Sequence, residues 1–118
     1  MFPYLNEFLQ ELQQQAQALR QQAKAFAADR RQDDADFAKI EANIYEVCAT
    51  IGNVVCKIAP EGQQEALYRK KLSDLPHNWQ IALEAAEAHG NFQRAQVEKR
   101  KLAALEDVLA RLDGRGAL

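Results

Sequence analysis

The feature that most constrains this fold is a run of apolar residues in the second quarter of the chain. They recur at alternating steps of three and four residues: Phe37, Ile40, Ile44, Val47, Ile51, Val54 and Ile58. Many of them are β-branched, which favours strands. A strand, however, repeats every two residues, whereas alternating steps of three and four are the period of an amphipathic helix. The run therefore predicts a long helix at about 33–59.

A run with the same period precedes it and predicts a first long helix at about 3–30. Glutamine and alanine are good helix formers, and the glutamines of segment 13–22 fall mostly on the outward side of this helix. Asp33 or Asp34, in the charged turn that follows, is placed to cap the second helix. The apolar residues of the first run are Leu5, Leu9, Leu12, Ala16, Leu19, Ala23 and Phe26, with Phe8 beside them.

The rest of the chain predicts a third strut, broken near 73–78 by Pro76, and a final helix at about 91–112. The final helix is expected to face inward with Phe92, Ala95, Leu102, Leu105, Leu109 and Leu112. Short connections make successive helices antiparallel. The sequence thus predicts an all-α, up-down antiparallel four-helix bundle, as one domain over 1–113 with a frayed tail at 114–118.

Residues 79–102 resemble the helical hairpin of a tetratricopeptide repeat, over about a fifth of the chain. The residues that carry the resemblance are Trp79, Ala82, Leu83, Ala86, Gly90, Asn91, Phe92 and Ala95. It implies a helical hairpin that turns at Gly90, with a small residue where the helices cross. No second copy lies upstream, and one repeat cannot form a solenoid, so the resemblance assigns no family.

Cys48, Gly52 and Cys56 form a ridge of small residues spaced four apart on the second helix. A glycine inside a helix costs about 0.5–1 kcal/mol relative to alanine, so we expect a close helix crossing to compensate. The neighbour would be the third strut or a second subunit, unless the helix ends at Gly52. This is our candidate helix-crossing or interface ridge. The two cysteines, about 12 Å apart along a helix, are too distant for a disulfide and are expected to be buried free thiols.

The break in the third strut is the other candidate site, at Pro76, His77 and Trp79. Pro76 suits the start of a new helical piece, and Ser73, Asp74 or Asn78 could cap it. We expect Trp79, the only tryptophan, to turn inward and dock this piece on the two long helices. The corner is therefore interpreted as a joint that could also face a partner.

The chemistry that the sequence offers is sparse. Metal sites in helical bundles use Glu-x-x-His pairs, and neither His77 nor His89 has a glutamate three residues before it. Ser73 near His77 fits a cap better than a catalytic dyad. No glycine-rich phosphate loop is present. We therefore expect no enzyme activity, no metal and no cofactor. With no run of 18 apolar residues and no signal segment, the chain is expected to be cytoplasmic and not to enter a membrane.

These expectations leave recognition of another protein as the favoured function. Sustained heptads favour helix-on-helix assembly, so the partner could be a second copy, giving a homodimer. One alternative is a nucleic-acid-associated regulator that uses two basic clusters, Arg69-Lys70-Lys71 and Arg94 with Lys99-Arg100-Lys101. The net charge of −2 argues against it, because nucleic-acid binders are strongly basic. The other alternative is a bundle that binds a small apolar ligand between its helices.

Overall fold

The computed structural model describes residues 5–60 and 62–116, which are helical apart from short turns and contain no strand. The helices are α1 (Leu5–Ala28), α2 (Gln32–Ile58), α3 (Gln64–Asp74), α4 (Pro76–Ala88) and α5 (Phe92–Gly116). The helices α3 and α4 are the two pieces of the predicted third strut, and they meet at Leu75. The prediction of an all-α four-helix bundle with a broken third strut is confirmed.

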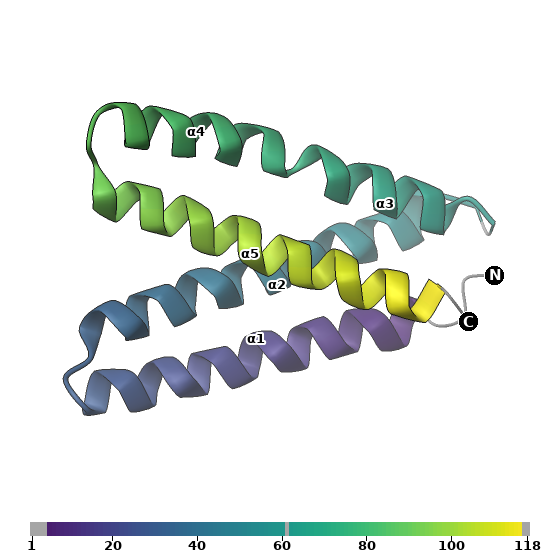
Figure 1. The fold of residues 1–118 in the computed structure, drawn as a ribbon. Coiled ribbons are helices and arrows are strands. Elements are labelled where there is room, and N and C mark those ends of the chain that lie inside the picture. Colours follow the sequence, from purple (N-terminus) through teal and green to yellow (C-terminus); the bar gives the residue numbers. More distant parts are fainter. Residues whose placement is uncertain (1–4, 61, 117–118) are drawn as a thin grey trace.

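The helices follow one another in alternating directions, as predicted (Figure 1). The helices α1 and α2 form a long hairpin, and the α3–α4 strut returns along the opposite side of the molecule. The last helix, α5, runs between them and crosses α2 (Figure 1). The close packing is uneven: α1 lies along α2, while α4 packs against α5 rather than against the α1–α2 hairpin.

The main core is built on the apolar side of α1, where the predicted residues from Leu5 to Leu19 are buried, whereas Phe26 is only partly buried in a smaller cluster with Ala23. The ring of Phe8 meets that of Tyr68 of α3 edge to face, with centroids 6.4 Å apart. The residues of α5 that join this core are Ala104, Leu105, Val108 and Leu112. The α1 side chains thus meet residues of three other helices.

The second helix buries mainly a different side from the one that carries its apolar run. Of its apolar run, Ile44 is buried, but Val47, Val54 and Ile58 are exposed. The core-facing side instead carries small residues and a few larger ones: Ala35, Ala38, Ala42, Ile44, Tyr45, Cys48, Ala49, Gly52 and Val55. The apolar run of α2 is therefore only partly internal.

The turns explain several local differences from the sequence-based expectations. Neither Asp33 nor Asp34 caps α2, whose first turn contains both. Nor does a side chain cap α4, since the Ser73 hydroxyl donates to the Lys70 carbonyl instead. Gly90 has a φ of +70° at the α4–α5 turn, a conformation that glycine adopts without strain.

The α4–α5 hairpin implied by the tetratricopeptide-like residues is present. The Asn91 side chain caps α5 by accepting from the Arg94 amide at 3.1 Å. Ala86 and Ala95 are both buried, one in each helix of the hairpin. The last helix continues to Gly116, beyond the predicted end at residue 112, and residues 117–118 lie outside the described part of the chain.

None of the helices described is both long enough and apolar enough to cross a membrane.

Candidate interaction surface

The outward side of α2 carries several exposed apolar side chains. We call it the α2 stripe and define it as Ile40, Val47, Ile51, Val54 and Ile58. At 100° per residue, these five positions fall within about 60° of one another around the helix. Val47, Val54 and Ile58 are 40%, 45% and 63% exposed, and Ile40 and Ile51 are partly buried. Single exposed apolar residues are ordinary, but a continuous stripe of them marks an interaction site more often.

The exposed part of the stripe stays uncovered because α3 packs on another side of α2. Its contact at Cys48 lies about 80–120° around the helix from the exposed stripe residues. The helix α3 packs on the C-terminal half of α2, where the Tyr68 hydroxyl donates to the Cys48 carbonyl at 2.9 Å. At Pro76 the strut continues as α4, which packs on α5. No helix in the described part of the chain therefore lies along the stripe.

The ridge of small residues lies on the core side of α2, where α1 approaches closely. A Cβ on Gly52 would overlap the Leu9 Cδ2 atom and lie 3.0 Å from Cδ1 and 3.2 Å from Cγ. The close neighbour of Gly52 is thus α1, not the third strut or a second subunit as we expected. The helix α2 is continuous through Gly52, which excludes the expected alternative of a helix end there.

The two cysteines of this ridge are free and differ in burial. Cys48 is fully buried, and desolvation raises the pKa of its thiol to about 12. Cys56 is only partly buried, and desolvation raises the pKa of its thiol less strongly. Cys48 therefore serves as a small apolar residue of the core, and neither thiol is activated as a nucleophile.

A groove with an acidic rim lies at the N-terminal end of the α2 stripe, between α2 and α5. Phe37, Ile40, Phe92 and Val97 form its apolar lining, with Asp33 and Asp36 at the rim. No basic side chain of the described residues lines it. Phe92 is 82% exposed, so the prediction that it faces the core was wrong. Phe92 is the first residue of α5, and its ring borders this groove rather than the core.

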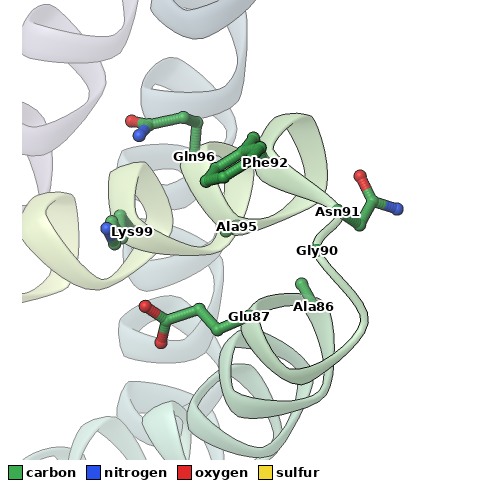
Figure 2. Close-up of a pocket in the computed structure, with 8 residues that line it drawn as sticks. All are labelled: Ala86, Glu87, Gly90, Asn91, Phe92, Ala95, Gln96 and Lys99. Carbon is green, nitrogen blue, oxygen red and sulfur yellow. The ribbon is translucent and has the colours of Figure 1, made fainter.

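Phe92 also borders a smaller hollow in the corner of the α4–α5 hairpin. Figure 2 shows its ring beside the first turns of α5, with Ala86 and Ala95 deeper in the corner and Glu87 and Lys99 at the side. Phe92 and Gln96 line both this hollow and the acidic groove. The exposed ring thus stands between two surface depressions.

A second groove lies at the C-terminal end of the α2 stripe, where α2 turns into α3. Its apolar lining comes from Ile58, Ala59, Pro60, Ala66 and Leu67. Its one charged lining residue in the described part of the chain is Lys70, and the exposed Lys57 is next to Ile58 in the sequence. The two ends of the stripe thus carry charges of opposite sign.

The joint in the third strut lies against the main core. Trp79 is partly buried and packs against the main core together with Leu75. His77 is exposed and Pro76 partly buried at the start of α4. The role of the joint is to hold the strut on the core while turning α4 onto α5.

The two basic clusters are largely occupied by carboxylates. Arg69 pairs with Glu65 at 3.2 Å and with Asp113 at 2.5 Å. Arg100 pairs with Glu41 at 3.1 Å, and its guanidinium lies 4.9 Å from the centre of the Phe37 ring. These arginines form ion pairs between helices, so they offer less positive charge to a nucleic acid than the sequence suggests.

Glu98 is a functional candidate that the sequence interpretation missed. It lies seven and fourteen residues before Leu105 and Leu112, so it belongs to the same buried side of α5, and its side chain is 1% exposed. Its Oε1 accepts from Arg94 at 3.0 Å and from Lys101 at 3.3 Å, while its buried Oε2 has no partner. The heptad spacing 98, 105, 112 could have indicated this buried acid. None of the hollows described above is lined by it, so it forms no visible binding site.

A second polar contact that the sequence hid joins α5 to α2. The Tyr45 hydroxyl donates to Asp107, and Arg111 donates to the same carboxylate oxygen at 2.7 Å. Desolvation and then the Asp107 contact raise the pKa of Tyr45 well above its usual range. Desolvation would raise the pKa of Asp107, but the hydrogen bonds from Tyr45 and Arg111 outweigh it and lower this pKa. The i, i+4 spacing of Asp107 and Arg111 indicates their pair, whereas no spacing in the sequence indicates the contact with Tyr45.

Among the described residues, no group of three or more histidine, cysteine, aspartate or glutamate side chains could hold a metal ion. Protein-family models, curated protein sequences and solved structures give no match to this chain. We therefore infer the function of this protein from the geometry of its surface.

Proposed function

We propose that this protein is a helical protein–protein interaction module that binds its partner through the α2 stripe. The observation that supports the proposal is that Val47, Val54 and Ile58 of the apolar run are exposed on a side of α2 that no helix of the described residues covers. Amphipathic helices recognise partners through anchors spaced i, i+3/i+4 and i+7. The exposed Val47, Val54 and Ile58 have this spacing, at steps of seven and four.

The charges around the α2 stripe are compatible with this role. Charged residues are depleted at the centres of protein interfaces and enriched at their rims. The centre of the stripe is apolar, while Asp33, Asp36, Lys57 and Lys70 lie toward its ends. This is the arrangement of a contact surface with an apolar core and a polar rim.

Site-specific photo-crosslinking in the native host tests the proposal. A photoreactive residue placed at Val54 should give protein adducts several-fold more abundant than one placed at Asn53. Asn53 is the matched control because it is also exposed but points about 100° away around the helix. Equal adduct yields at the two positions would contradict the α2 stripe as the contact face, whatever the identity of the adducts.

A further inference from the structure

We infer that the occupant of the α2 stripe is a second copy of this chain, paired antiparallel across a two-fold axis. This inference rests on the proposed function and names the partner. It is carried by two properties of the stripe: four of its five apolar positions match one another when the helix is reversed, and the charged residues that line the grooves at its two ends are of opposite sign.

The apolar match follows from the residue numbers. A two-fold interface uses the same patch on both copies, so the patch must be complementary to itself. With the axis at the level of Ala49, Ile40 of one α2 lies opposite Ile58 of the other, and Val47 lies opposite Ile51. The stripe spans about 27 Å from Ile40 to Ile58. Two reversed stripes therefore match at these two pairs, while Val54 lies at the level of Ile44, which is buried.

The charge match follows from the same arrangement. Reversal brings the groove with Asp33 and Asp36 at its rim toward the partner's groove, which carries Lys70 beside the exposed Lys57. The two-fold axis produces this meeting twice, once at each end of the stripe. A parallel pairing would instead place acid against acid and base against base, and like charges opposite one another suppress wrong arrangements.

The apolar linings of the two grooves would also meet in this arrangement. The exposed Phe92 ring, which borders the acidic groove, would come to the partner's corner formed by Ile58 and Pro60. Each copy then covers the most exposed apolar side chains of the other. A partner of unrelated sequence would not require the two ends of the stripe to be complementary to each other.

A charge-exchange experiment on the full chain tests this pairing. The acidic variant pair is Asp33→Lys with Asp36→Lys, and the basic variant pair is Lys57→Glu with Lys70→Glu. We expect the wild-type protein to sediment at twice its chain mass of 13.3 kDa, at a concentration on the order of 100 µM that suits a micromolar dissociation constant. Each double variant alone should raise the dimer dissociation constant by at least about tenfold, since like charges then meet at both ends.

The decisive step is to mix the two double variants in equal amounts. In the mixed pair, the introduced lysines meet the introduced glutamates at one end, and the native charges meet at the other. The mixture should therefore recover the dimer mass that each variant alone has lost. Glu84→Lys with Glu106→Lys makes the same charge change at exposed positions outside the stripe, and it should stay dimeric.

A monomeric wild-type protein at this concentration would overturn the second-copy inference, as would a mixture that remains monomeric. So would double variants that both dimerise as well as the wild type. The single changes Asp36→Lys and Lys57→Glu, mixed in the same way, keep the test valid if a double variant fails to fold by circular dichroism. A monomer that still gives Val54-specific adducts with a different protein would overturn only the second copy and leave the proposed function standing.

Discussion

The apolar side of α1 and the α2 stripe have the same spacing and opposite surroundings. The α1 residues from Leu5 to Ala23 in this pattern are all buried, whereas Val47, Val54 and Ile58 of α2 are exposed. This difference in exposure follows from the residues that each helix carries on its other sides. Opposite its apolar side, α1 has glutamines that are mostly exposed, so only one side of it can enter a core.

The second helix has two apolar sides, and the one with the smaller residues forms the core. Ala38, Ala42, Ala49 and Gly52 let α1 approach closely, and the leucines of α1 fill the space above them. A large side chain of α1 that packs at interior density above small residues makes more van der Waals contacts than it would against β-branched residues. Periodicity therefore identifies an apolar side, but it does not say which of two such sides is internal.

The largest loss of stability should come from truncating a buried apolar side chain of α1. Phe8→Ala removes a fully buried ring that touches Tyr68 and should lower the free energy of unfolding by about 3–5 kcal/mol. Phe92→Ala is the matched control, because the same side chain is 82% exposed there, and it should change stability by less than about 0.5 kcal/mol. Urea unfolding followed by circular dichroism measures both. Similar losses from the two variants would contradict the assignment of inside and outside.

Trp79→Ala tests whether the third strut is held on the core. The indole is partly buried against the main core, so we expect a loss of about 2–3 kcal/mol, below the 3–5 kcal/mol typical of fully buried tryptophan. Thermal and urea unfolding of the variant measure it. A loss under about 1 kcal/mol would mean that Trp79 supports a partner contact rather than the joint.

Gly52→Leu tests the close approach of α1 to the small-residue side of α2. The new side chain would overlap Leu9, and overpacking of this kind typically costs about 1–3 kcal/mol. Asn53→Leu is the matched control at the adjacent exposed position and should stay within about 0.5 kcal/mol of the wild type. If Gly52→Leu were as stable as this control by urea unfolding, the close crossing would not exist.

The smallest expected effect concerns the polar contact between α2 and α5. Asp107→Ala removes the acceptor of Tyr45 and Arg111 and should cost about 1 kcal/mol at neutral pH, since the carboxylate is partly solvated. The pKa of Asp107 is lowered from 3.8 by folding. Its contribution is therefore present above pH 3.8 and is lost as the pH falls through the lower value in the folded protein.

The difference in unfolding free energy between wild type and Asp107→Ala should accordingly shrink in acid. Urea unfolding near neutral pH and again at about pH 2.5 compares it above pH 3.8 and in the acid range where the contribution declines. An equal difference at the two pH values would mean that the ionised carboxylate makes no contribution of its own.

Much of the fold could be predicted because local patterns determine it. The single apolar side of α1 allows one interpretation, Pro76 cannot continue a regular helix with full hydrogen bonding, and Gly90 supplies the positive φ of the last turn. These features gave the helix order and the broken strut. They depend only on residues that are close in the sequence.

The candidate surface could be predicted only in part, because its exposure depends on distant elements. Val54 is exposed because the helices that pack on α2, which are α1, α3 and α5, lie against its other sides, while α4 packs on α5 through Ala86 and Ala95. Nothing in the spacing of the α2 residues encodes that arrangement. The burial of Glu98 likewise depends on the rotation of α5 against its neighbours, although its heptad position gave a hint.

Adjacent valines on α2 provide the most direct test of the central claim, that α2 keeps its small residues inside and its β-branched stripe outside. Val55 is fully buried and Val54 is 45% exposed, so the same substitution samples both sides of one helix. Unfolding free energies should be measured at protein concentrations low enough to keep the chain monomeric. We predict that Val55→Ala lowers stability by about 1.5–3 kcal/mol, while Val54→Ala changes it by less than about 0.5 kcal/mol. Equal losses at the two positions, or a larger loss at Val54, would contradict the account.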